Sequence, residues 1–158
     1  MSNKKLAKLL LVIFMVEFLA INLIDSLYYG VINTLLFGVG IILQLLCFVF
    51  IQEVGKGKWF LVNIGLLVLI PLLFIFNLPS TTYEGGKVIV QNEIINDEVT
   101  FVSTDYKLIQ TTDNSSWFIG DFMYHYEVEV SGEKLFYVVN PTNGSSRQLE
   151  EDFFRYDR

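Results

Sequence analysis

Long apolar runs fill the first half of the chain, and short alternating patterns fill the second half. Three runs, at residues 6–24, 31–51 and 59–78, carry almost no charge. About 20 consecutive apolar residues are enough for a helix to cross a ~30 Å hydrocarbon layer. Inside lipid such a run must be helical, because each backbone N–H and C=O has to find its partner within the segment. The pattern therefore predicts three transmembrane helices in residues 1–78.

Two features of the runs leave this prediction unchanged. Pro71 lies in the third run, where a transmembrane helix tolerates proline with a local kink. A group of lysines precedes the first run: Lys4, Lys5 and Lys8. They resemble the charged start of a signal peptide, but the apolar stretch is long and no small-x-small cleavage site precedes Asp25. We interpret the first run as a retained helix.

The lysines in the short loops predict the orientation. Lysines flank the first run and recur in the second loop at Lys56 and Lys58, whereas the first loop, residues 25–30, has none. Cytoplasmic loops carry the excess of lysine and arginine. We therefore expect a multi-pass protein of the plasma membrane with a cytoplasmic N-terminus. After three crossings, residues 79–158 would form an extracellular domain.

From residue 81 onward the apolar positions recur with period two, which indicates β-strands. The expected strands are residues 87–95, 98–103, 106–111, 117–119, 122–131, 134–140 and 146–149. Turn residues at 131–133 and 140–144 favour antiparallel reversals. The fold class expected is a membrane protein of α+β type, with three transmembrane helices followed by a small antiparallel β-rich extracytoplasmic domain.

Composition and charge narrow the class of partner. The chain is 53% hydrophobic and its formal net charge is −6, with a mean hydropathy of +0.48. Residues 1–78 hold five basic and three acidic residues, and residues 79–158 hold six basic and fourteen acidic residues. Nucleic acid would be repelled by so acidic a domain, and anionic lipid as well. The single cysteine, Cys47, lies in the second run, so no intrachain disulfide can form.

Polar residues inside the runs are candidates for contact with a partner. Glu17 lies near the middle of the first run, where an ionised carboxylate costs at least ~2.5–3.5 kcal/mol. It either contacts a proton, an ion or a partner, or it is protonated and bonds a neighbouring helix. Gln44 shares a helical stripe with Asn33 and is expected to meet Glu17, while Asn63 gives the third run a polar point.

A ladder of small residues in the second run predicts a face for helix packing. Gly30, Thr34 and Gly38 follow a small-xxx-small spacing that allows another helix to approach closely. This face would pack against the third helix of the same chain or against a helix of another subunit. A homo-oligomer is possible.

One face of the strand at 122–131 carries His125, Glu127 and Glu129. Alternate strand residues project the same way, so two such side chains can chelate one ion. No second cluster completes the coordination, and we interpret the three residues as a solvated face that is a candidate surface for binding, with no metal. After an acidic run, the aromatic residues Phe153, Phe154 and Tyr156 are expected to dock on the sheet, because exposed apolar patches are usually covered.

Residues 124–150 resemble the closing hairpin of PepSY-type domains, a strand pair followed by a reversal and a last strand. The matching positions are 126–130, 136–139, Asn140, Pro141 and Gly144. Asn143 stands where the family usually has threonine before glycine, and the sequence does not show the alanine-rich helix that precedes the hairpin. The resemblance implies an extracytoplasmic module that binds a partner and has no catalytic residues.

Function is expected to be non-catalytic. No nucleophile–base pair, phosphate-binding glycine loop or metal-ligand spacing stands out, so we expect no enzyme, no catalytic residue and no cofactor. The leading hypothesis is an accessory or regulatory membrane protein, whose outer domain binds a protein or peptide and whose helices dock on a larger complex such as a transporter, sensor or protease. The alternatives are an immunity protein against a secreted toxin or bacteriocin, and a small homo-oligomeric channel or ion-coupled carrier that uses Glu17. The composition of the loops looks bacterial.

Overall fold

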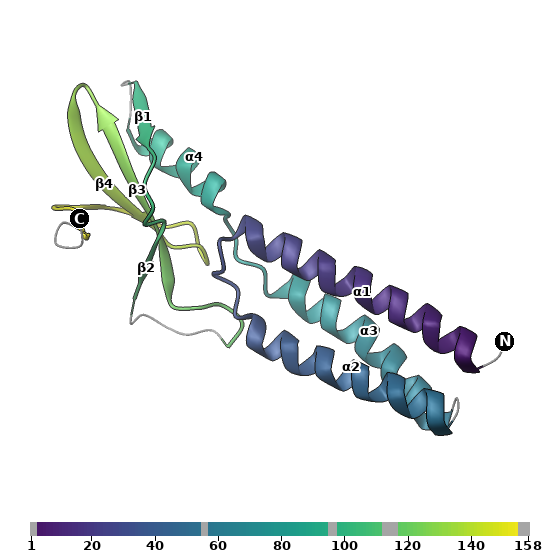
Figure 1. Ribbon diagram of the computed structural model, residues 1–158. Helices are drawn as coiled ribbons and strands as arrows, with labels where there is room; N and C mark the ends of the chain where they lie inside the picture. The colour runs from purple at the N-terminus through teal and green to yellow at the C-terminus, as the bar shows by residue number, and fades with distance from the viewer. Residues whose placement is uncertain (1–2, 55–56, 95–97, 112–116, 155–158) are drawn as a thin grey trace. The chain divides into compact units, whose positions relative to one another are not determined.

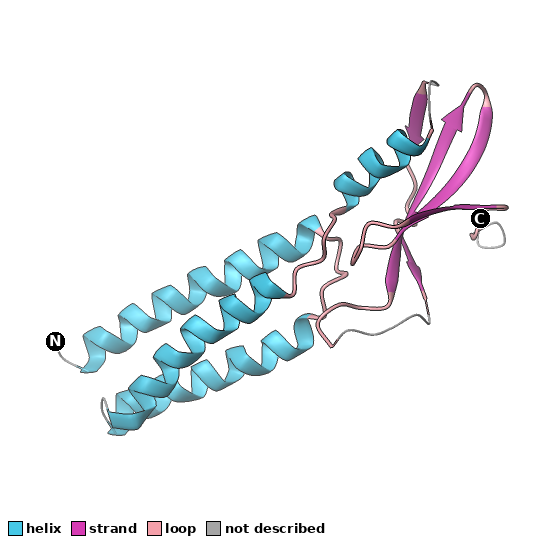
Figure 2. Cartoon of the chain, turned by 180° about the vertical axis from the view of Figure 1, so that it is seen from behind, coloured by secondary structure: helices cyan, strands magenta, loops and turns pink. Residues whose placement is uncertain are grey.

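The chain begins with three long helices that run side by side (Figure 1 and Figure 2). The computed structural model describes residues 3–54, 57–94, 98–111 and 117–154. The three helices are α1 (Asn3–Leu27), α2 (Thr34–Val54) and α3 (Gly57–Phe76). Each is long and apolar enough to span a membrane, as the sequence predicts. Large apolar side chains cover their outer surfaces, which suits contact with lipid rather than water.

The contacts of the chain divide it into two units. The first unit contains Met1–Ser26 and Asn33–Leu78, and the second contains Leu27–Ile32 and Pro79–Arg158. From the apolar runs, residues 25–30 are expected to form a loop of the three-helix region. The structure instead builds most of that loop into the second unit.

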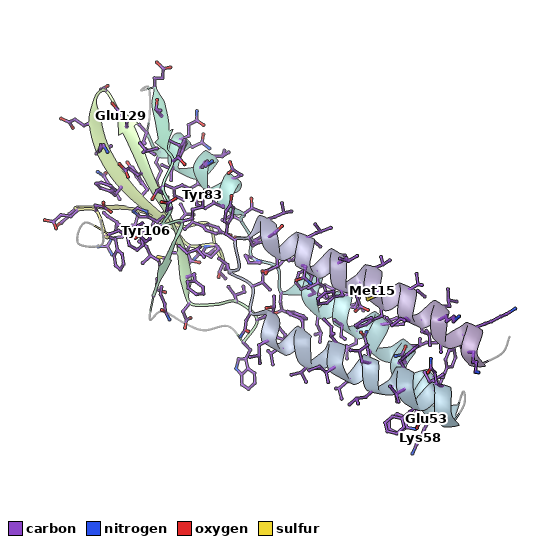
Figure 3. All side chains as sticks on the ribbon, viewed as in Figure 1. Met15, Glu53, Lys58, Tyr83, Tyr106 and Glu129 are labelled. Atoms are coloured by element: carbon purple, nitrogen blue, oxygen red, sulfur yellow. The ribbon has the colours of Figure 1, made fainter. Side chains whose placement is uncertain are left out.

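Close packing of α2 against α3 holds the first unit together. A Cβ added to Gly40 would lie 2.8 Å from Cδ1 of Ile70, so the absence of a side chain at residue 40 allows the two helices to approach. The rings of Phe37 and Phe74 meet edge to face, with their centroids 5.1 Å apart. Near the other end, where Figure 3 labels Glu53 and Lys58, buried apolar residues of α1 and α2 form a small core.

The second unit is built on an antiparallel sheet. Its strands are β1 (Val99–Val102), β2 (Leu108–Gln110), β3 (Phe122–Val130), β4 (Glu133–Val139) and β5 (Ser146–Leu149). The order is β1-β3-β4-β5, and β2 also pairs with β3. Both β1 and β2 lie along the same strand, β1 beside residues 127–130 and β2 beside residues 122–124. The sheet is therefore not a simple meander, because one of its edges is a strand in two pieces.

The predicted turns are present at both reversals. Ser131 and Gly132 have φ values of 52° and 87°, which joins β3 to β4 through a tight two-residue turn. Gly144 has a φ of 69° and its N–H donates to the carbonyl of Asn140 at 2.8 Å. Glycine adopts this left-handed conformation without steric cost.

The prediction of a strand at residues 87–95 is wrong, since α4 (Tyr83–Glu93) is a helix. Thr82 caps it by accepting a hydrogen bond from the N–H of Gly85 at 3.1 Å. Its buried residues are Tyr83, Gly86 and Val90, which follow the spacing of one helical face rather than that of a strand. Residues 95–97 lie outside the described part of the chain.

One core forms between α4 and the sheet. Tyr124, Tyr126, Val128 and Val130 of β3 point to the same side and are buried there. The expected strand at residues 117–119 is reduced to a single bridge between Ile119 and Ile32.

Candidate functional site

A polar cluster lies among the three apolar helices. The amide of Gln44 on α2 donates from Nε2 to Oε2 of Glu17 on α1 at 3.1 Å. Asn63 on α3 donates from Nδ2 to the backbone carbonyl of Gln44 at 3.1 Å. Gln44 is 1% exposed and Asn63 is 4% exposed. The predicted contact between Glu17 and Gln44 is therefore present, and Asn63 joins it.

The cluster has more acceptors than donors. Three buried side-chain oxygens, Oε1 of Glu17, Oε1 of Gln44 and Oδ1 of Asn63, have no hydrogen-bond partner among the described residues. A buried oxygen without a donor costs about 1–3 kcal/mol. A proton on Glu17, or a donor from another molecule, would reduce this cost.

An apolar groove of about 290 Å³ adjoins the cluster between α1 and α3. Glu17 is the single ionisable residue among those that line it. Ile13 and Ala20 of α1 form one wall, and Leu67 and Pro71 of α3 form the other. Because Pro71 has no N–H, the carbonyl of Leu67 lacks the donor that helix geometry would otherwise provide. The groove therefore combines an apolar surface with hydrogen-bond acceptors.

The other polar and small residues predicted for the membrane region lie apart from this cluster. Asn33 is exposed just before α2, and its Oδ1 accepts from the N–H of Leu35 at 3.3 Å, so it caps the helix. Gly30 precedes α2, in a left-handed conformation with a φ of 77°. Gly38 has no atom within 4 Å of an added Cβ, and Thr34 is exposed. These positions do not pack on α3, whereas Gly40 does.

The interpretation of His125, Glu127 and Glu129 as a solvated face is wrong for two of the three residues. His125 is 0% exposed and Glu127 is 2% exposed, while Glu129 is exposed near the turn of the hairpin (Figure 3). Lys134 of β4 forms an ion pair with Glu127, with Nζ 2.7 Å from Oε1. Glu127 is therefore engaged in a structural ion pair.

Aromatic side chains cover His125. The ring of Phe154 stacks on Tyr106 at 4.4 Å between centroids and meets His125 edge to face at 5.3 Å. The docking of the C-terminal aromatic residues is thus confirmed for Phe154, whereas Phe153 is 57% exposed. Tyr156 lies outside the described residues. His125 is buried because a segment distant in sequence folds over it.

A cluster of tyrosines on the α4 side of the sheet was missed by the sequence analysis. The ring of Tyr83 lies 4.8 Å from that of Tyr126 and 4.9 Å from that of Tyr29. The hydroxyl of Tyr126 donates to the backbone carbonyl of Tyr83 at 2.7 Å. Burial, with smaller effects of Tyr29 and Glu84, raises the pKa of Tyr83 to about 12. Burial also raises the pKa of Tyr126 above its ordinary value.

Comparisons with known proteins do not assign the chain. No protein-family model, curated protein or solved structure matches it. The likeness of residues 124–150 to PepSY-type domains stays a prediction. Within the described residues, no group of three histidine, cysteine, aspartate or glutamate side chains is arranged to hold a metal ion.

Proposed function

We propose that this chain is a non-catalytic accessory or regulatory membrane protein that links binding by the second unit to the state of the helices. The observation that carries the proposal is that the loop Leu27–Ile32, between α1 and α2, belongs to the second unit. The second unit would lie on the extracellular side of the plasma membrane, where the lysine distribution favours placing it.

The loop is built into the core of the second unit. Val31 is 0% exposed, and its carbonyl accepts from the N–H of Gly120 at 2.7 Å. Ile32 pairs with Ile119 in a β-bridge. The hydroxyl of Tyr124 donates to the carbonyl of Tyr28 at 3.3 Å. A rearrangement of the second unit would therefore displace the residues that end α1 and begin α2.

The number of chain connections supports regulation over simple anchoring. One helix is sufficient to anchor a domain. Here the chain passes between the two units after Ser26, before Asn33 and after Leu78. Each of α1, α2 and α3 thus has one end joined to the second unit by only a few residues. A conformational change in the second unit could therefore act on the helices through three covalent connections.

The polar cluster supports docking on a partner within the membrane. Polar side chains stabilise helix association in lipid, by about 0.6–2 kcal/mol each. The groove beside Glu17 offers apolar surface and acceptors to a helix from a transporter, sensor or protease. Such a helix would supply a donor at the depth of Glu17.

Cross-linking in cells tests this function. A photoreactive residue at Ala20, in the groove, should give one discrete adduct when the protein is expressed at native abundance. The matched control is a photoreactive residue at Leu19, which is 55% exposed but does not line the groove. Gentle extraction should recover the same partner in stoichiometric amount. Repeated recovery of the protein alone, without an adduct at Ala20, would rule the proposal out.

The surplus of acceptors favours a second candidate function, an ion-coupled carrier or a channel formed by several copies. Protons and cations both bind to carboxylate and amide oxygens, and intramembrane carboxylates mark ion pathways. Reconstituted vesicles should then show flux that Glu17→Gln abolishes. Flux that persists unchanged in Glu17→Gln would exclude this mechanism.

A further inference from the structure

A cleft opens in the second unit where the edge strand of the sheet is interrupted. β1 ends at Val102 and β2 begins at Leu108, and residues 103–107 belong to neither strand. Within this segment the carbonyl of Lys107 still accepts from the N–H of His125 on β3 at 2.9 Å. The cleft has a volume of about 580 Å³ and is lined by this segment together with Tyr29 and Leu108. Sites for small ligands typically measure about 300–1,000 Å³. The cleft is therefore large enough for a few residues of a peptide.

A smaller cavity of about 170 Å³ shares a wall with the cleft. Ser103, Thr104 and Lys107 line both spaces, and Tyr83 and Phe101 line the smaller one. Figure 3 labels Tyr83, which lines the smaller cavity, and Tyr106, which lines the cleft. The shared wall brings Lys107 into both spaces.

Lys107 is the distinctive residue of the cleft. Its Nζ donates to the hydroxyl of Tyr29 at 3.1 Å and lies 4.3 Å from the centre of that ring. It also lies 5.4 Å from the ring centre of Tyr83. An ammonium group has three donors, and the described residues provide no carboxylate that forms an ion pair with Lys107. Aromatic faces stabilise the cation but accept no full hydrogen bond.

The neighbouring charges do not neutralise Lys107. Glu84 pairs with Lys87 at 2.9 Å, and Glu127 pairs with Lys134 at 2.7 Å. Asp105 also lines the cleft, but it is exposed and forms no ion pair with Lys107. A half-buried cation without a carboxylate is unusual in a domain with fourteen acidic residues among its last eighty. An anionic ligand in the cleft could form an ion pair with this ammonium group.

We propose that this cleft binds a peptide segment through a carboxylate, which Lys107 receives beside the ring of Tyr29. This inference rests on the proposed function and specifies the ligand of the second unit. A peptide suits the cleft because its N–H groups match the carboxylate of Asp105 and its side chains match the aromatic rings. The carboxylate belongs either to the C-terminus of the peptide or to an acidic side chain.

Binding at Lys107 would reach the membrane region through Tyr29. Tyr29 lies in the loop between α1 and α2 and has a φ of 54°, a conformation that few residues other than glycine adopt. A carboxylate that draws the ammonium toward itself weakens the hydrogen bond from Lys107 to the hydroxyl of Tyr29. The ligand and the loop thus compete for the same ammonium group.

Equilibrium dialysis of the full-length protein in detergent micelles tests the inference. The probes are two pools of random tetrapeptides with acetylated N-termini, one with free C-terminal acids and one with C-terminal amides. Mass spectrometry of the retained peptides should find only peptides with a carboxylate. Retention in the acid pool irrespective of side chain indicates the C-terminus, and retention of only Asp- or Glu-containing amides indicates the side chain. Both results support the proposal.

Three variants assign the binding to Lys107. Lys107→Met should weaken retention about tenfold or more, because a hydrogen bond to a charged group contributes about 1.5–3 kcal/mol. Lys107→Arg should retain most of the binding. Arg147→Met is the matched control and should bind like the wild type, because Arg147 is exposed on β5 and lines neither the cleft nor the smaller cavity.

Several results would overturn the inference. With the wild-type protein, these are retention of peptides with and without a carboxylate alike, or no retention from either pool. Retention by Lys107→Met equal to that of the wild type would also overturn it. So would complete displacement of the peptide by inorganic phosphate at the same concentration. The comparison of acids with amides uses the wild-type protein, so it decides the matter even if Lys107→Met fails to fold. The dialysis contains no membrane partner. Its outcome is therefore independent of the cross-linking at Ala20 that tests the proposed function.

Discussion

Gly86 lies where α4 packs against the ring of Tyr126 on β3. A Cβ at this position would lie 2.0 Å from the hydroxyl oxygen of Tyr126 and 2.9 Å from Cζ of the same ring. Tyr126 cannot move away easily, because it is 1% exposed and its hydroxyl bonds the carbonyl of Tyr83. The tyrosine ring therefore takes the space that a side chain would need.

Gly86→Ala should destabilise the second unit by about 1–3 kcal/mol, the usual cost of overpacking. The expected sign is opposite to helix propensity, which favours alanine over glycine by about 1 kcal/mol. Thermal unfolding followed by the near-ultraviolet circular dichroism of the tyrosines measures the effect. Val88→Ala is the control, since Val88 is exposed on the same helix. An unchanged or raised melting temperature in Gly86→Ala would contradict this packing.

Tyr83 makes the stability of the second unit sensitive to alkaline pH. Its pKa is raised to about 12, so the folded state holds the phenolic proton more tightly than the unfolded state, whose pKa is near 10. The stabilisation is complete below pH 10 and is lost as the pH rises from about 10 to about 12. Absorbance of tyrosinate should show a late titration step whose amplitude falls in Tyr83→Phe, while the raised pKa of Tyr126 keeps part of the step. A titration that ends near pH 10.5 for all tyrosines would refute this.

The side-chain contacts that could be predicted from the sequence are those of residues whose surroundings restrict their choice of partner. Glu17 and Gln44 are polar groups in apolar helices, so their contact follows from the cost of leaving either alone in lipid. Asn63 bonds a backbone carbonyl, which leaves no trace in the sequence. His125 was assigned to a solvated face because its cover, Phe154, lies far along the chain. Packing between residues far apart in the chain leaves no pattern in the local sequence from which it could be predicted.

At the scale of elements, length and periodicity decided what was predictable. The long apolar runs permit no alternative to helices, and the polarity of β3 alternates from Tyr124 to Val130. Residues 88–90 of α4 are an unbroken run of β-branched side chains, Val-Ile-Val, which suggests a strand. The helix becomes evident only through Tyr83, Gly86 and Val90, which face the sheet at helical spacing. Short elements are decided by their tertiary contacts rather than by their own sequence.

The close packing of α2 against α3 requires a residue without a side chain at position 40. Gly40→Ile should destabilise the membrane region by about 1–3 kcal/mol, because the new side chain would overlap with Ile70. Adding Ile70→Ala should restore part of the loss. The control is Gly38→Ile, because an added Cβ at Gly38 meets no atom within 4 Å. Unfolding in mixed micelles with increasing denaturing detergent measures the three variants. Equal effects at the two glycines would show that the approach at Gly40 is unimportant.

For the whole molecule, the proposed orientation places the second unit outside the cell. Single cysteines at Ser103 and Gln52, in a chain with Cys47→Ser, report the two sides of the membrane, since both positions are exposed. A membrane-impermeant maleimide should label Ser103→Cys in intact cells. Gln52→Cys should react only after the cells are permeabilised. The reverse pattern would invert the orientation and place the peptide cleft in the cytoplasm.

The loop Leu27–Ile32 also determines when the second unit can be completed during synthesis. Val31 and Ile32 leave the ribosome before any residue of α2 or α3, yet Gly120 and Ile119, to which they bond, are made much later. The loop therefore has no final partners until residues 119 and 120, which follow all three long helices in the chain, have been made. A chain begun at Pro79 would lack these residues and would leave their place in the core empty. We therefore expect the second unit to lose stability when it is cut away at Pro79 or fused to another anchor, and to complete its fold only after the three helices have been synthesised.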